Sequence, residues 1–124
     1  MLYKQNQSYE LDEKLFKNPT SEYRAAPFWA WNCKLNKDIL NEQIDIFKKM
    51  GFGGFHMHSR IGMSTPYLKD EFMELIKFCT QKAKQENMLA YLYDEDRWPS
   101  GAAGGYVTKT HKYSQRYLIF TQNS

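Results

Sequence analysis

The stretch LAYLYDEDRWPSGAAGG, residues 89–105, decides the fold and carries the first candidate site. An apolar run over residues 88–93 opens it, and the length and flanks of this run favour a buried β-strand over a helix. Asp94, Glu95 and Asp96 follow where the run ends, and a polar, turn-forming loop comes next. Three adjacent carboxylates repel one another, so they need a cation, a metal or a hydrogen-bonding ligand nearby. We therefore expect a site at the end of this strand.

Two further strands are predicted upstream of this stretch. Residues 25–32 are mostly apolar and compatible with a strand, and Pro27 lies near the start, where a missing N–H is tolerated. Residues 52–58 form the second strand. Gly53 and Gly54 within it indicate that another part of the backbone approaches closely.

Two amphipathic helices separate the three strands. The first is predicted to begin after an Asn36 cap and to stop at Gly51. The second is predicted from about residue 70 to residue 86 and ends at Asn87. Spacings of three and four residues define the apolar faces, which carry Ile39, Leu40, Gln43, Ile44, Phe47 and Met50 in the first helix and Phe72, Leu75, Ile76, Cys79 and Ala83 in the second.

The two ends of the chain carry weaker signals. Residues 1–20 form a polar lead-in segment with at most one short helix, indicated by Leu11, Leu15 and Phe16. Residues 21–24 continue this segment. Residues 106–124 fit either the end of a third helix or the start of a new strand.

The order strand, helix, strand, helix, strand predicts an α/β fold with parallel strands, because each helix is long enough for a right-handed crossover. Parallel α/β architectures bind their ligands at the carboxyl ends of the strands. The residues at these ends are Trp31, Asn32, His58, Ser59, Arg60, Asp94, Glu95 and Asp96.

Composition limits the class of protein. A chain of 124 residues, 42% of them hydrophobic, suits one domain with a real core. The net charge of +3 comes without a basic stripe, so we expect no nucleic-acid partner and no membrane partner. No secretory signal and no membrane-spanning run is evident. Cys33 and Cys79 match neither a zinc spacing nor a disulfide framework, which favours a cytoplasmic location.

His56 and His58 form the clearest pair of candidate ligands. Alternate residues of a strand point to one face, as do the paired histidines that hold a metal in barrel hydrolases. The other interpretation is that one imidazole packs in the core and the second hydrogen-bonds to a ligand or a carboxylate. Only His111 could join the pair. We therefore assign no metal and expect no cofactor.

The three carboxyl groups at residues 94–96 could supply an acid or a base, as a carboxyl pair does in glycoside hydrolysis. Neighbouring residues on a strand point to opposite faces, however, so two of them are a poor catalytic pair. A clamp on substrate hydroxyls, or an ion pair with Arg60 or Arg97, is the simpler role. Trp31 and Trp98 offer flat faces that suit either a sugar or the core.

Other motifs carry less information. The glycines at positions 51–54 and 101–105 do not form a phosphate-binding pattern, so packing and turns explain them better. Neither Ser100 nor Cys33 has an activating base in the sequence around it, and we expect neither to be a nucleophile.

Three blocks of the sequence together resemble a known family. PFWAWN (27–32), GFGGFHMHSRIGMSTPYL (51–68) and LYDEDRWPSGAAGG (92–105) are similar to the N-terminal part of the catalytic (β/α)8 barrel in bacterial glycoside hydrolases related to α-L-rhamnosidase family 106. The resemblance covers about residues 16–117. It implies a partial TIM barrel of about three parallel βα units over residues 21–124, and a plant or microbial glycan as substrate.

The resemblance also implies what this chain lacks and what it supplies. A full barrel takes about 250 residues, and the family's acid and base lie on later strands, so we expect the rest of the barrel or a partner chain to complete the enzyme. The catalytic residues are therefore unknown. The contacts with sugar that the resemblance implies are Trp31, Asn32, His58, Arg60, Asp94, Glu95 and Trp98. Cys33 stands where glycine is expected, which leaves the shape of the first loop open.

Two rivals to the glycoside hydrolase remain. One is a metal-dependent hydrolase that uses His56 and His58. The other is a non-catalytic fragment that binds carbohydrate.

Overall fold

Three parallel β-strands, paired in the order β1-β2-β3, form the sheet of the computed structural model, which describes residues 9–98 and 100–122. Strand β1 spans Phe28–Trp31, β2 spans Gly54–Ser59 and β3 spans Leu89–Asp96. These are the three strands that the sequence predicts, with the predicted parallel direction. Strand β3 runs on through the three carboxyl residues, because a register shift between Met57 and Ser59 lets its pairing with β2 continue as far as Asp96.

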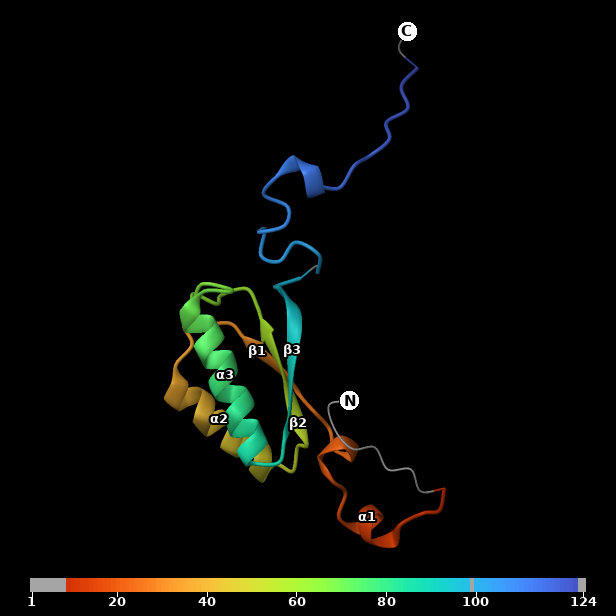
Figure 1. Ribbon diagram of the computed structural model, residues 1–124, viewed down its shortest axis with the longest axis vertical. Helices are drawn as coiled ribbons and strands as arrows, with labels where there is room; N and C mark the ends of the chain where they lie inside the picture. Colours follow the sequence, from red (N-terminus) through yellow and green to blue (C-terminus); the bar gives the residue numbers. More distant parts are fainter. Residues whose placement is uncertain (1–8, 99, 123–124) are drawn as a thin grey trace.

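Helices α2 (Lys37–Lys49) and α3 (Asp70–Gln85) both cover one face of the sheet (Figure 1). The predicted cap of α2 is confirmed, because Asn36 Oδ1 accepts hydrogen bonds from the backbone N–H groups of Asp38, at 2.9 Å, and Ile39, at 3.1 Å. Gly51 ends this segment with a positive φ of 83°.

The two predicted apolar faces differ in outcome. In α3, Phe72, Leu75, Cys79 and Ala83 are buried and Ile76 packs against the core, as predicted. In α2, Leu40 and Ile44 are buried, but Ile39 and Met50 are exposed, so the prediction was wrong for these two residues.

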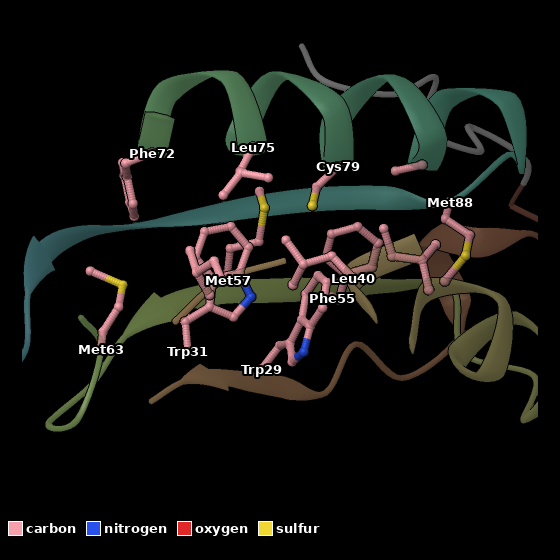
Figure 2. Close-up of a cluster of buried hydrophobic side chains, with 13 residues drawn as sticks. Trp29, Trp31, Leu40, Phe55, Met57, Met63, Phe72, Leu75, Cys79 and Met88 are labelled. Carbon is pink, nitrogen blue, oxygen red and sulfur yellow. The ribbon is translucent and has the colours of Figure 1, made fainter. Parts of the chain in front are cut away.

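The core lies between the sheet and the two helices. Figure 2 shows Trp29 and Trp31 of β1, and Phe55 and Met57 of β2, pointing toward the side chains of α3. Cys79 is completely buried among them, and this burial raises the pKa of its thiol to about 12. The core therefore uses every second residue of β1 and β2 and leaves the alternate residues for the opposite face.

Gly53 and Gly54 lie where the chain approaches itself closely, as predicted. A Cβ atom on Gly53 would stand 1.9 Å from the Ser21 carbonyl oxygen, and one on Gly54 would stand 2.3 Å from the Leu89 carbonyl oxygen. The second contact belongs to the β2–β3 pairing. Only glycine allows the two strands to take this register.

The lead-in segment contains one short helix, α1 (Glu13–Lys17), and a 3₁₀ turn, η1 (Ser21–Tyr23). The Ser21 hydroxyl donates to the Asn87 carbonyl, and the Gly53 N–H donates to the Ala25 carbonyl at 2.9 Å. These bonds hold the segment at the amino ends of β2 and β3. The predicted residues 1–8 of this segment lie outside the described residues.

The C-terminal segment differs from both alternatives that its sequence suggested. Residues 106–122 contain neither an α-helix nor a strand, and their one regular element is the 3₁₀ turn η2 (His111–Tyr113). Figure 1 shows this segment leading away from the sheet beyond the end of β3. Within residues 9–98 and 100–122, no helix has the length and apolar character needed to cross a membrane.

An ion-pair network joins α2 to α3. Lys82 Nζ lies 2.8 Å from Asp45 Oδ1 and 2.8 Å from Glu86 Oε1, and Lys48 pairs with Glu86 as well. The hydrogen bonds from Lys48 and Lys82 hold the pKa of Glu86 at about 2. Asp45 and Lys48 therefore mark the flank of α2 that faces α3.

Glu86→Gln is expected to lower the midpoint of thermal unfolding at pH 7, because two lysines lose their shared carboxylate. The loss should shrink in 1 M NaCl, since salt screens partly exposed pairs. Glu74→Gln is the matched control, because Glu74 forms only a 3.8 Å pair with Lys77 within one helix. Equal midpoints for both variants at low salt would show that the network does not stabilise the fold.

Candidate functional site

The carboxyl edge, meaning the end of the sheet formed by Trp31, Ser59 and Asp96, brings three loops together. Trp31 is the partner of Ser59 in the β1–β2 register, and Ser59 is the partner of Asp96 in the β2–β3 register. The Arg60 N–H donates to the Trp31 carbonyl at 2.9 Å, and the Arg97 N–H donates to the Ser59 carbonyl at 3.1 Å. The residues that follow the three strands therefore start side by side.

The open face, meaning the face of the sheet away from α2 and α3, carries five rings: Phe28, His56, His58, Tyr91 and Tyr93. The His58 ring lies 4.7 Å from Phe28 and 3.8 Å from Tyr93, measured between ring centroids. His56 stacks on Tyr91 at 4.5 Å. The two histidines share one face, as their spacing predicts, but each is packed against an aromatic ring.

His58 is the most unusual group on this face. Its side chain is buried, at 3% exposure, and neither ring nitrogen makes a hydrogen bond of good geometry within the described residues. Burial lowers its pKa, the Arg97 backbone raises it, the Arg60 charge lowers it further, and the net pKa lies below the usual value of 6.5. The imidazole is therefore neutral at pH 7, with one nitrogen able to donate and one able to accept.

Polar side chains from β3 and from the loops after β2 and β3 lie around His58. The Arg60 guanidinium lies over the Phe28 ring, 5.9 Å from its centroid. The Ser100 hydroxyl donates to Asp94 Oδ1 at 3.3 Å and lies 3.0 Å from the Tyr93 hydroxyl. A cation, a carboxylate and two hydroxyl groups thus stand around one neutral imidazole.

Glu95 has a different role from the predicted contact with sugar. Its carboxylate accepts hydrogen bonds from five backbone N–H groups, at 2.6–2.8 Å, which belong to Asp96 and to residues 101–104. Burial by itself raises the pKa of Glu95, but these hydrogen bonds outweigh burial and hold it at about 2. Both oxygens are occupied, so we assign Glu95 to the architecture of the loop.

The other two carboxyl groups, those of Asp94 and Asp96, lie in different environments. Asp94 is exposed and faces Ser100, whereas Asp96 Oδ1 is buried, 3.7 Å from Arg97 Nε. The Asp96–Arg97 contact is the ion pair that the sequence suggested as one alternative. Burial first, and then the negative charges of Glu95, Asp96 and Asp94, raise the pKa of the nearby Tyr67 hydroxyl.

The remaining predicted residues, Trp31, Asn32 and Trp98, differ in exposure. Trp31 is a core residue, at 2% exposure, and packs against Trp29 and Phe72 at 5.5 and 5.8 Å between ring centroids. Its indole is covered by its neighbours, so we remove it from the candidate site. Asn32 and Trp98 are exposed at the carboxyl edge, and Trp98 has 70% of its surface free.

Three residues of the candidate site were missed from the sequence: Phe28, Tyr93 and Ser100. Tyr93 could have been found, because Tyr91 and Tyr93 alternate in β3 as His56 and His58 alternate in β2. Ser100 carried no such signal. It reaches Asp94 only because the loop folds back around Glu95.

The metal alternative receives no added support from the geometry. Across residues 9–98 and 100–122, no three His, Cys, Asp or Glu side chains are grouped as metal ligands would be. The pair of histidines stays an untested prediction as a metal site.

Comparison with solved structures gives a likeness of fold. No family model matches the chain, and no curated protein matches it. Among solved structures, a rhamnosidase from Novosphingobium sp. PP1Y is similar over 77% of this chain, with a TM-score of 0.64 and 24% sequence identity. The match covers 10% of that rhamnosidase, so this chain spans about a tenth of its length. The likeness supports a shared α/β arrangement.

Proposed function

We propose that this chain forms the first three βα units of a glycoside hydrolase barrel and that its carboxyl edge contributes contacts to a sugar. Support comes from the parallel sheet with both helices on one face and from the likeness of fold to a rhamnosidase. In a barrel, the remaining strands would pair with the free edges of β1 and β3 and would cover the open face. The catalytic acid and base would then come from outside this chain.

His58 is the observation that carries this proposal. A buried polar group without a hydrogen bond costs roughly 1–3 kcal/mol, so a ligand that satisfies both ring nitrogens recovers this cost on binding. A sugar hydroxyl can both donate and accept a hydrogen bond, and adjacent hydroxyls can reach both sides of one imidazole. A neutral imidazole in which neither nitrogen makes a hydrogen bond of good geometry therefore suits a polyol better than an anion.

The surrounding residues complete the match to a sugar. Arg60 would donate to a hydroxyl or ring oxygen, and Asp94 would accept from a second hydroxyl. Phe28, which is partly exposed beside His58, would contact the C–H face of the ring. Asn32 and Trp98 would form the rim. We propose binding by these groups and no turnover by this chain alone.

The test is a titration of the ¹⁵N-labelled chain with L-rhamnose, followed by amide chemical shifts. We expect saturable shifts in the loops that follow β2 and β3. Arg60→Ala should weaken binding about tenfold or more, because hydrogen bonds to charged groups contribute roughly 1.5–3 kcal/mol. Asp94→Asn should weaken binding less, since the amide oxygen still accepts.

Arg24→Ala is the matched control for this titration. Arg24 donates to the Pro19 carbonyl at 2.6 Å in the lead-in segment, at the opposite end of the sheet, so its loss should leave the affinity for sugar unchanged. The proposed site would be contradicted if L-rhamnose caused no chemical-shift changes in the natural chain. It would also be contradicted if Arg60→Ala showed the same changes at the same sugar concentrations. Hydrolysis of an aryl α-L-rhamnoside by the chain alone would contradict the assignment of binding without turnover.

A further inference from the structure

A chain of three polar side chains runs beside His58. The Tyr93 hydroxyl lies 3.0 Å from the Ser100 hydroxyl, and the Ser100 hydroxyl lies 3.3 Å from Asp94 Oδ1. The Tyr93 ring packs on His58, with 3.8 Å between the ring centroids, so the chain begins next to the buried imidazole. Ser100 and Asp94 are exposed, so the other end of the chain is accessible to a ligand.

The direction of the hydrogen bonds in this chain follows from the chemistry of its members. A carboxylate only accepts hydrogen bonds, so the one hydroxyl hydrogen of Ser100 is donated to Asp94. The Ser100 oxygen then accepts from Tyr93, which uses the one hydroxyl hydrogen of Tyr93. Both hydroxyl hydrogens are therefore used within the chain. Toward a ligand, the chain presents only acceptors.

The loop holds Ser100 in place through bonds outside this chain. The backbone N–H groups of Gly101 and Ala102, directly after Ser100, donate to Glu95 at 2.8 and 2.7 Å. The Ser100 hydroxyl is therefore positioned before a ligand arrives, and its hydrogen bond favours one orientation of the Asp94 carboxylate. A side chain that is already ordered loses less conformational entropy on binding.

The Phe28 side of His58 offers donors instead. Phe28 and Tyr93 belong to the strands on either side of β2, and the Arg60 guanidinium lies over the Phe28 ring, 5.9 Å from its centroid. A guanidinium carries five N–H donors and no acceptor. The candidate site is therefore polarised across His58, with donors beside Phe28 and acceptors beside Tyr93.

We propose that Ser100 and Tyr93 are positioning residues that orient Asp94 as an acceptor, so that this side of the site selects a ligand hydroxyl that donates. This inference rests on the proposed binding of sugar. A ligand that fits both sides must donate at Asp94 and accept at Arg60, which the neighbouring hydroxyls of a neutral sugar can do. A sugar carboxylate beside Asp94 would bring a like charge and no donor, so the site should discriminate against it.

The test is a set of titrations with methyl α-L-rhamnoside and its 2-, 3- and 4-deoxy analogues, each followed by the amide chemical shifts of the ¹⁵N-labelled chain. We expect Ser100→Ala to weaken binding of the parent glycoside about threefold to tenfold, because Asp94 must then be ordered on binding. Ser100→Thr keeps the hydroxyl and should restore most of the affinity. Tyr93→Phe keeps the ring on His58 and should weaken binding less than Ser100→Ala.

The deoxy analogues separate positioning from a general loss of structure. One analogue lacks the hydroxyl that donates to Asp94, so the natural chain should bind it more weakly, and Ser100→Ala should not weaken it further. Ser114→Ala is the matched control, because it removes the same hydroxyl from the residue after η2 and should leave every affinity unchanged. Hydrogen exchange at amides 101–104 should be equal in Ser100→Ala and the natural chain.

The outcomes distinguish this inference from the proposed function. An equal loss of affinity for the parent glycoside and all three analogues in Ser100→Ala would overturn the inference, and so would faster exchange at amides 101–104, since either result marks a structural role. A natural chain that binds the parent glycoside and is unaffected by Ser100→Ala would overturn the inference and leave the proposed binding of sugar intact. A natural chain that binds no glycoside would overturn both.

Discussion

Glu95→Ala is expected to open the loop of residues 97–105 and to lower the free energy of unfolding by about 3–5 kcal/mol. The substitution removes the carboxylate that accepts hydrogen bonds from five backbone N–H groups. The loop also holds Arg97 and Ala103 at positive φ values of 71° and 48°, which non-glycine residues rarely adopt. Without the carboxylate, the loop loses five of the hydrogen bonds that hold this strained backbone in place.

Glu95→Gln separates the charge of the side chain from its size. The amide fits the same space, but one accepting oxygen becomes an NH₂ donor that faces backbone donors. We therefore expect Glu95→Gln to destabilise the loop as well, by less than the alanine variant. Urea unfolding gives the loss of stability, and hydrogen exchange at amides 101–104 shows whether the loop has opened.

The pH dependence tests the same carboxylate in the natural protein. Its pKa falls from 4.5 in the unfolded chain to about 2 in the folded chain. A lowered pKa means that the stabilisation is fully present above pH 4.5 and is lost as the pH falls toward 2. The urea midpoint of the natural protein should drop in this window more steeply than that of Glu95→Gln, which cannot titrate at this position.

Glu74→Gln provides the control for these measurements, because Glu74 is exposed on α3 and makes only a weak pair within its helix. Its urea midpoint should follow that of the natural protein at every pH. If Glu95→Gln also keeps the natural midpoint and unchanged exchange at amides 101–104, the five hydrogen bonds do not organise the loop.

Gly54→Ala is the second substitution with a large expected effect. The added methyl group would stand 2.3 Å from the Leu89 carbonyl oxygen and 3.0 Å from the Leu89 Cβ atom. Because the first of these is a backbone atom of the paired strand, the clash is relieved only by moving β2 and β3 apart. We expect a loss of about 3 kcal/mol, the upper end of the usual cost of overpacking, and faster hydrogen exchange along β3.

Gly53→Ala is the matched control for Gly54→Ala, since the same methyl group is added one residue earlier. It would meet the Ser21 carbonyl oxygen of the lead-in segment and not the neighbouring strand. It should release residues 21–25 while β3 keeps its protected amides. Gly54→Ala with protection along β3 equal to that of the natural protein would contradict the assigned register.

The elements of this protein were predictable because each depends on local patterns. The helices follow from spacings of three and four residues and from the Asn36 cap, and the strands follow from short apolar runs between turn residues. The apolar face of α2 was predicted too wide. Helical spacing places Ile39 and Met50 close to the buried residues Leu40 and Ile44. Which of these side chains contacts the sheet depends on the rotation of the helix about its own axis relative to β1.

The candidate site was predictable only in part. The sequence indicated the carboxyl edge, and His58, Arg60 and Asp94 lie on or beside the open face there. It could not assign different roles to Asp94, Glu95 and Asp96, because the three adjacent residues carry the same chemical group. Only the folded loop shows that Glu95 accepts the hydrogen bonds from the backbone N–H groups of residues 101–104. Trp31 was misjudged for a similar reason: the side of the sheet to which a strand-end residue points depends on the register with β2.

The sequence by itself determined the order of strands and helices, their parallel direction and the edge at which polar residues gather, since period, capping and crossover length are local properties of the chain. Only the tertiary structure decided which polar groups form hydrogen bonds within the protein and which remain available to a ligand. Hydrogen bonds between residues 95 and 101–104, and the packing of His58 between rings from two other strands, depend on where separate segments meet in space. No periodic pattern in the sequence predicts these contacts between distant segments.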